Sequence, residues 1–194
     1  MGDHVALEAS DRPKPAPRKV QSVCSEADLA LMLQASERDL RWWRFIATLT
    51  DTGMRSGEVL GLKWEHLRLD QFPPYAELPT TKTVPRLVPM SKRLCRDVFT
   101  PANVAALRFA EPPRRGKFHR DPQVYVFLWS YSVASRGFQH FCKVLGLPYR
   151  GLHGFRRSWA TRTIGAGGSI VGVSKVLGHS SVSVTSAYYE QPRP

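Results

Sequence analysis

Cysteines and long apolar runs are both scarce in this sequence, and each scarcity excludes a class of protein. The 194 residues include three cysteines, Cys24, Cys95 and Cys142, without C-x-x-C spacing. Neither a disulfide framework nor a cysteine-based zinc site is therefore expected, and the pattern fits a reducing cytosol. No apolar run approaches the roughly 20 residues that cross a bilayer, and the N-terminus has charges and prolines where a secretory signal needs an apolar core. We expect a soluble, cytoplasmic protein.

Acidic residues are also few relative to basic ones. The chain has 16 Asp and Glu against 28 Lys and Arg, which gives a formal net charge of +12. This balance favours a polyanionic partner, either nucleic acid or an acidic membrane surface. Because 42% of the residues are hydrophobic and five are Trp, we expect a folded core that carries this charge. The length suits one compact domain.

The first 21 residues differ in composition from the rest. Pro13, Pro15 and Pro17 alternate with basic residues there, which favours an extended, solvated chain over a helix. We interpret residues 1–21 as a flexible basic linker or tail. It could lie on DNA phosphates, or its charge could be incidental. Residues 22–194 are expected to form the folded domain.

Residues 151–189 hold the densest group of side chains able to act on a phosphate. His153 and Arg156 lie three residues apart in a segment with helical spacing, so both point to one face of a helix. Two adjacent cations favour a bound anion. Glycines end this helix, and Ser169 can begin the next one.

A second turn follows at Leu177-Gly178-His179. Gly178 allows the backbone to bend tightly, which could direct His179 back to the same pocket. Ser180 or Ser181 can then begin a last helix that carries Tyr188.

A further arginine lies in the segment 52–64, far upstream. Gly53 can close a preceding helix in the left-handed conformation, and Ser56 can begin a new one, so that Arg55 lies at the junction and faces the same anion. Glu58 either orients an active-site group by hydrogen bonding or is only a first-turn carboxylate favoured by the helix dipole.

The remaining pattern predicts an α+β fold that is mainly helical. Strand-like alternation over 67–69, 75–78 and 86–88 indicates a small three-stranded antiparallel sheet. A further short strand is expected over 124–127. Helical spacing is found over the approximate ranges 25–36, 37–50, 91–99, 101–110 and 133–145.

In this order, these motifs resemble those of the tyrosine recombinases, also called phage integrases. The matching boxes are T-G-x-R-x-x-E-x-x-x-L-x-W at 52–64, H-x-x-R at 153–156, L-G-H at 177–179 and T-x-x-Y at 185–188. A lone H-x-x-R is usually a solvated helix face, and a tyrosine pair near a terminus usually packs, but the ordered set is specific. The resemblance covers residues 22–194 and implies the catalytic domain of that family. The core-binding domain that usually precedes it is not expected within this chain.

The resemblance implies a site-specific recombinase or integrase of a mobile element. Such an enzyme cleaves and rejoins DNA strands through a 3′-phosphotyrosyl intermediate, and no metal, ATP or other cofactor is expected. The catalytic residues would be Arg55, Lys82, His153, Arg156, His179 and Tyr188, with Glu58 in a supporting role.

Each of these residues has an expected task. Arg55 and Arg156 would hold the phosphate by bidentate hydrogen bonds, as a metal does elsewhere. Lys82, on the turn between the second and third strands, would be the general acid for the 5′-oxygen, although a surface lysine is the simpler alternative. His153 would exchange a proton with the tyrosine or bind the phosphate, and His179 would donate a hydrogen bond to it.

Two adjacent tyrosines compete for the role of nucleophile. Tyr188 is preferred over Tyr189 because Thr185-x-x-Tyr188 and the nine-residue step from His179 match the family motif. Glu190 stands where the family often has a histidine.

Double-stranded DNA is the expected partner, with self-association into a tetramer on DNA as in the family and a monomeric isolated domain. The basic residues most able to contact DNA are Arg114, Arg115, Lys117 and Arg120 in the loop 111–122, and Arg136 and Lys143 on the helix 133–145. The alternatives are a type IB topoisomerase-like enzyme that relaxes DNA, and a DNA-binding remnant of an integrase that does not cut.

Overall fold

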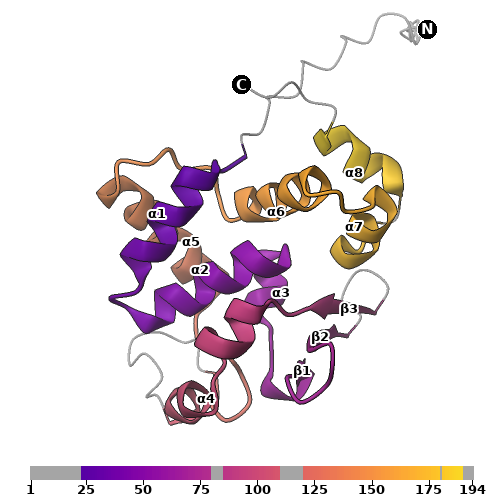
Figure 1. The fold of residues 1–194 in the computed structure, drawn as a ribbon. Coiled ribbons are helices and arrows are strands. Elements are labelled where there is room, and N and C mark those ends of the chain that lie inside the picture. The colour runs from indigo at the N-terminus through magenta and orange to yellow at the C-terminus, as the bar shows by residue number, and fades with distance from the viewer. Residues whose placement is uncertain (1–22, 80–84, 110–119, 180, 190–194) are drawn as a thin grey trace, which may run out of the picture.

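The computed structural model describes residues 23–79, 85–109, 120–179 and 181–189 and shows a mainly helical fold with a small sheet at one side (Figure 1). This confirms the predicted fold class. The described elements are α1 (Glu26–Ser36), α2 (Leu40–Thr52), α3 (Ser56–Leu60), η2 (Trp64–His66), β1 (Leu67–Arg68), β2 (Tyr75–Leu78), β3 (Arg86–Pro89), η3 (Leu94–Val98), α4 (Pro101–Arg108), α5 (Tyr131–Val144), α6 (His153–Gly165), α7 (Ile170–Leu177) and α8 (Val182–Tyr189).

Helix α2 is the centre of the core. It packs against α1, α3, α6 and η3, and its residues from Arg44 to Thr50 are all buried. The ring of Phe45 meets those of Phe127 and Trp129 edge to face, at centroid distances of 5.6 and 5.7 Å. The helix begins at Leu40 rather than near residue 37, because the Asp39 side chain accepts the Arg41 N–H and caps it.

The described strands form an antiparallel sheet in the order β1-β2-β3. In β2, Ala76 and Leu78 are buried while Glu77 is exposed, as expected for a strand with one face on the core. Residues 124–127 do not form the expected strand. Their backbone makes one isolated bridge, Lys63 to Tyr125, because the N–H groups of Val124 and Tyr125 both turn back to the Asp121 carbonyl.

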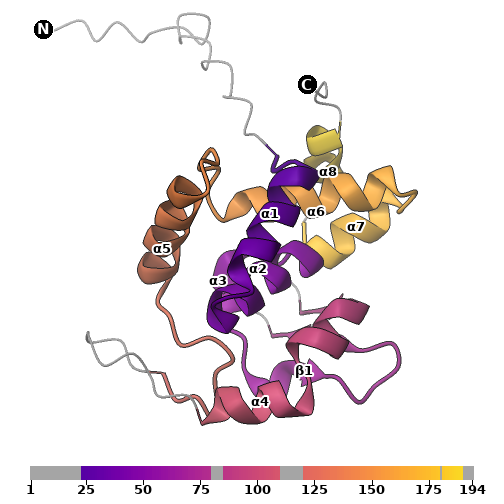
Figure 2. The ribbon, with the colours of Figure 1, turned by 60° about the vertical axis from the view of Figure 1, so that its left-hand side comes forward.

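Helices α6, α7 and α8 gather at one end of the molecule (Figure 2). Helix α6 packs on α2, α7 packs on β3, and α8 contacts both α6 and α7. The Ser169 side chain accepts the Gly172 N–H and begins α7, as predicted, and Gly178 ends α7 with a left-handed φ of 65°. The arrangement brings the C-terminal third of the chain next to the α2–α3 junction.

Several other classes of site are not found in the described part of the chain. The three cysteines are free thiols, and burial raises the pKa of Cys142 to about 11, which makes that thiol unreactive. No described group of His, Cys, Asp or Glu side chains is arranged to hold a metal ion. None of the described helices is long and apolar enough to cross a bilayer.

Candidate active site

Arg55 lies at the junction between α2 and α3. Gly53 ends α2 with a left-handed φ of 62°, and the chain then turns into the short helix α3. Arg55, rather than the expected Ser56, occupies the N-cap position of α3, and Ser56 is the first residue of the helix. The Glu58 carboxylate accepts the Arg55 backbone N–H at 2.7 Å, which closes this turn.

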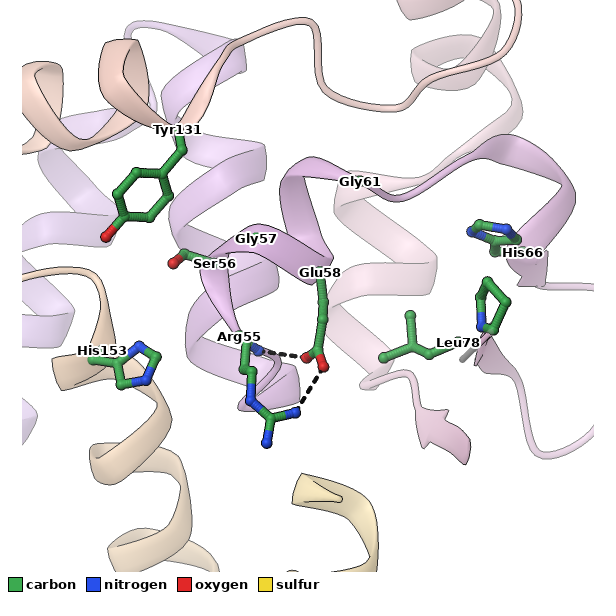
Figure 3. Close-up of a pocket in the computed structure, with 10 residues that line it drawn as sticks. Arg55, Ser56, Gly57, Glu58, Gly61, His66, Leu78, Tyr131 and His153 are labelled. Atoms are coloured by element: carbon green, nitrogen blue, oxygen red, sulfur yellow. Dashed lines mark hydrogen bonds and ion pairs between the residues drawn. The ribbon is translucent and has the colours of Figure 1, made fainter. Parts of the chain in front are cut away.

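Glu58 also binds the Arg55 side chain (Figure 3). Arg55 Nη1 donates to Glu58 Oε1 at 2.9 Å, and Nη2 donates to the Gly178 carbonyl at 3.4 Å. Burial alone would raise the pKa of the Glu58 carboxyl, but hydrogen bonds from Arg86 and Arg55 outweigh it, so the pKa is lowered. Glu58 is therefore an ionised group that fixes the direction of Arg55.

Arg86, on β3, is a member of this cluster that the sequence reasoning missed. Its side chain is 8% exposed, and Nη2 donates to Glu58 Oε2 at 2.7 Å. Its Nε donates to the Val176 carbonyl, in α7, at 2.8 Å. The available signal was its position shortly after Lys82 in the sequence, at the start of the third expected strand, but a strand arginine has no distinctive spacing.

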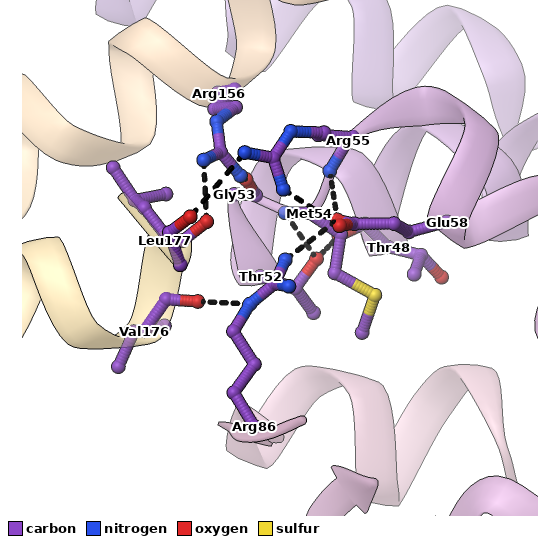
Figure 4. Close-up of polar contacts among 11 residues, drawn as sticks. Thr48, Thr52, Gly53, Met54, Arg55, Glu58, Arg86, Arg156, Val176 and Leu177 are labelled. Atoms are coloured by element: carbon purple, nitrogen blue, oxygen red, sulfur yellow. Dashed lines mark hydrogen bonds and ion pairs between the residues drawn. The ribbon is translucent and has the colours of Figure 1, made fainter. Parts of the chain in front are cut away.

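Arg156, in the second turn of α6, joins the same cluster from the other side (Figure 4). It is 5% exposed, and its two terminal nitrogens donate to different backbone carbonyls. Nη1 donates to Gly53 O at 3.0 Å, and Nη2 donates to Leu177 O at 2.5 Å. Arg156 thus connects the C-terminal ends of α2 and α7.

His153 is the first residue of α6 and lies on the exposed side of the cluster. Partial burial, and then the charges of Arg156, Arg157 and Arg55, lower the pKa of its imidazole. The sequence pattern suggested two adjacent cations, His153 and Arg156. In the structure, burial first and then the neighbouring arginines lower the pKa of His153, which favours the neutral imidazole over the cation.

His179 follows the left-handed turn at Gly178. Its ring Nδ1 lies 2.8 Å from the hydroxyl oxygen of Thr185, a fully buried residue of α8. Burial, followed by the charges of Arg156, Arg55 and Arg86, lowers the pKa of His179 to about 4. The turn therefore directs a neutral imidazole toward the arginine cluster, and Thr185 fixes its ring.

Of the two remaining predicted catalytic residues, Tyr188 belongs to a described helix and Lys82 does not lie among the described residues. Tyr188 lies in α8, three residues after Thr185, in the helix that His179 contacts. Tyr189 lies in the same helix. Lys82 falls outside the described residues. The strands that flank it in the sequence, β2 and β3, both reach the site: Leu78 lines the cleft, and Arg86 binds Glu58.

A cleft of about 530 Å³ opens beside this cluster. Arg55, Glu58 and His153 line one part of it, and Leu78 and Tyr131 line more apolar parts. Figure 3 shows these side chains coming from α3, β2, α5 and α6. The cleft is a place where a phosphate could meet Arg55 and His153 while the adjoining nucleotide contacts apolar surface.

Three of the six residues expected to contact DNA belong to the described part of the chain. Arg136 and Lys143 are exposed on α5. The Arg120 guanidinium stacks on the Tyr125 ring at 4.6 Å and donates to the Phe127 carbonyl at 3.2 Å. The other three, Arg114, Arg115 and Lys117, are not among the residues that the structure describes.

Comparison with known proteins identifies the family. The model of the phage integrase family matches residues 23–193. The chain belongs to this family. It is 28% identical over 173 residues to a tyrosine recombinase XerC-like protein of Caldanaerobacter subterraneus subsp. tengcongensis, covering 74% of this chain and 44% of that one. It is 26% identical over 193 residues to tyrosine recombinase XerC of Mesorhizobium japonicum, covering 94% of this chain and 58% of that one. The chain thus spans about half the length of these curated relatives.

Solved structures of other integrases and recombinases share the fold of this phage integrase domain. XerA recombinase aligns with a TM-score of 0.71 and 22% identity, over 93% of this chain and 62% of that one. The Tn1549 transposon integrase, solved in complex with circular intermediate DNA, aligns with a TM-score of 0.71 and 18% identity, over 96% and 65%. The catalytic domain of bacteriophage HP1 integrase aligns with a TM-score of 0.58 and 22% identity, over 86% of each chain.

Proposed function

We propose that this phage integrase domain cleaves and rejoins DNA strands at specific sites through a 3′-phosphotyrosyl intermediate, without a metal ion or ATP. One observation carries the proposal: Arg55 and Arg156, from distant parts of the chain, both bind carbonyls of the Leu177-Gly178 turn that precedes His179. Two fixed guanidinium groups at one point form a binding site for a phosphodiester.

The reaction begins with attack of the Tyr188 phenolic oxygen on the phosphorus. The bond from phosphorus to the 5′-oxygen breaks as the bond to the tyrosine forms, and the 5′-oxygen leaves with a proton as a free hydroxyl. Arg55 and Arg156 stabilise the charge on the two non-bridging oxygens. Because the phosphodiester energy is kept in the phosphotyrosine, the 5′-hydroxyl of another strand can attack it and restore a DNA backbone.

Three groups would handle the protons. The lowered pKa of His153 favours its neutral form, which would accept the phenolic proton of Tyr188 as the attack proceeds. In the tautomer whose Nδ1 accepts the Thr185 hydroxyl proton, His179 carries its own proton on Nε2, with which it would donate to the phosphate. Lys82 would protonate the 5′-oxygen from the turn between β2 and β3.

The proposed partner is double-stranded DNA, met in the cytoplasm at the chromosome or at a mobile element. The net charge of +12 supports this, and so do the exposed Arg136 and Lys143 on α5, which could contact phosphates. Strand exchange needs two DNA duplexes to be held together. We therefore propose that the chain is monomeric alone and self-associates on DNA.

The test uses the 194-residue chain and a pool of nicked duplexes whose sequence around the nick is randomised. After cleavage next to the nick, the short 5′-hydroxyl fragment is lost, so the covalent adduct accumulates and is scored on a denaturing gel. We expect adducts enriched in one DNA sequence, with phosphotyrosine at position 188. Tyr188→Phe should abolish the adduct while binding DNA normally, and Tyr189→Phe should retain it.

The proposal fails if the wild-type chain forms no adduct, or if the adduct survives Tyr188→Phe. The first result would support a DNA-binding remnant. Relaxation of supercoiled plasmid with no sequence requirement would instead assign the chain to DNA relaxation of the type IB topoisomerase class.

A further inference from the structure

Arg86 is a buried arginine that links the sheet to the phosphate-binding cluster without being one of the expected catalytic residues. We propose that Arg86 is a positioning residue for strand cleavage: it holds Glu58, and through Glu58 it holds Arg55, against the end of α7. This inference rests on the proposed function, because it assigns Arg86 a part in the reaction that Arg55 assists.

The contacts of Arg86 connect three separate segments of the chain (Figure 4). Its Nη2 reaches Glu58 on α3 at 2.7 Å, and its Nε reaches the Val176 carbonyl on α7 at 2.8 Å, while its own backbone begins β3. The two donors are different nitrogens of one planar group. A guanidinium can therefore fix the distance between α3 and α7, which the single nitrogen of a lysine cannot do in the same way.

The position of Glu58 depends on this second arginine. Oε2 of Glu58 accepts both the Arg55 backbone N–H and Arg86 Nη2, each at 2.7 Å, while Oε1 accepts Arg55 Nη1 at 2.9 Å. The Glu58 and Arg86 side chains are 13% and 8% exposed, so little water is available to replace either partner. Without Arg86 the carboxylate would keep its two bonds to Arg55 but would lose its link to β3 and α7, so the Glu58–Arg55 pair would be held less firmly against the end of α7.

The turn before His179 is shaped to accommodate Arg86. A Cβ placed on Gly178 would lie 3.0 Å from Arg86 Cδ and 3.0 Å from Arg86 Nη1. Since a side chain at Gly178 would press on Arg86, the glycine meets two requirements, a left-handed φ of 65° and close approach of this arginine. Arg86 thus touches the turn whose carbonyl also accepts a hydrogen bond from Arg55.

The first experiment measures the single-turnover rate of adduct formation at saturating DNA, on the sequence recovered from the randomised pool. For Arg86→Gln we expect a rate about 10- to 100-fold below that of the wild type, the range for groups that orient a catalytic residue. DNA affinity should change far less. Arg93→Gln is the matched control, because Arg93 also binds a poorly exposed carboxylate, that of Asp51 in α2. It should keep the wild-type rate.

A double-mutant cycle then separates positioning from a general structural effect. If Arg86 acts through Glu58, Arg86→Gln should slow a Glu58→Gln enzyme by less than about threefold, because the carboxylate it orients is already gone. Arg86→Lys, which keeps the charge, provides a second variant should Arg86→Gln fail to fold. The Arg86→Lys variant should fold and cleave at a rate between those of the wild type and Arg86→Gln. In the Glu58→Gln background, Arg86→Lys should cause no further decrease in rate.

A substrate with sulfur in place of the bridging 5′-oxygen supplies an independent readout. The thiolate leaves without a general acid, so this substrate would restore the rate of a variant that had lost only proton donation by Lys82. We expect no restoration for Arg86→Gln or Arg86→Lys. The role of Arg86 would be overturned if the rate decreases caused by Arg86→Gln and Glu58→Gln multiplied in the double variant, or if the sulfur substrate restored the rate of an Arg86 variant. Either result would leave the proposed function intact. Absence of any wild-type adduct would overturn both.

Discussion

Gly53 is a position where a single methyl group should have a large and calculable effect. The residue has a φ of +62°, and a Cβ added there would lie 2.7 Å from both Cδ2 and Cε3 of Trp159. The Trp159 ring cannot simply turn away, because its Nε1–H donates to the Asp51 carbonyl at 2.9 Å. Gly53→Ala therefore adds a steric overlap to an unfavourable backbone conformation.

The two costs can be estimated separately. A non-glycine residue in the left-handed region loses about 1–2 kcal/mol, and overpacking a buried site costs about 1–3 kcal/mol. Gly53→Ala should thus destabilise the domain by roughly 2–5 kcal/mol, which for a domain of this size lowers Tm by roughly 4–20 °C. The Gly53 carbonyl also binds Arg156, so adduct formation should slow as well.

Thermal and urea unfolding measure the stability change, with Gly146→Ala as the matched control. Gly146 has a similar φ of +67°, but nothing lies within 4 Å of an added Cβ, so only the conformational cost of about 1–2 kcal/mol applies there. In a Trp159→Leu background, the destabilisation caused by Gly53→Ala should fall to that same conformational cost, because the ring that the added Cβ would overlap is gone. If Gly53→Ala is no more destabilising than Gly146→Ala, the argument from the Trp159 contact is wrong.

The other predictions concern His179 and Arg156. Folding lowers the pKa of His179 to about 4, below the value of about 6.5 in an unfolded chain, so the unfolded state binds more protons between these values. Stability should be full above about pH 6.5 and fall toward pH 4, and His179→Gln should make the decline in Tm shallower. An equal decline of Tm with falling pH in the wild type and in His179→Gln would contradict this prediction. Arg156→Lys cannot reach both the Gly53 and Leu177 carbonyls, and leaving one buried acceptor unpaired should cost about 1–3 kcal/mol. Its adduct rate should fall about 100-fold or more, and a wild-type melting curve would refute the assigned contacts.

The features that were predictable from sequence are those set by neighbours in the chain. The left-handed ends at Gly53 and Gly178 and the start of α7 after Ser169 all depend on a few adjacent residues. The matching boxes likewise located Arg55 and the later site residues, although the roles assigned to them stay predictions. Local rules are sufficient here because capping and tight turns are satisfied within one or two helical turns.

The features that were missed depend on contacts between distant segments. Arg86 looks like an ordinary strand residue until β3 lies against α7, and only then does it meet Glu58. The lowered pKa of His153 depends on burial and on the charges of Arg156, Arg157 and Arg55. Such effects follow from packing, which spacing along the chain does not encode.

The two carbonyls bound by Arg156 have a consequence for when the proposed DNA cleavage could begin. They belong to the final turns of α2 and α7, so the arginine acquires its orientation only after those helices have docked. A nascent or heat-damaged molecule in which α7 has detached would retain its nucleophile but lack an ordered cradle for the ester. Under the proposed function, competence to cleave DNA would therefore arise only with complete folding, and partly unfolded copies would not cleave.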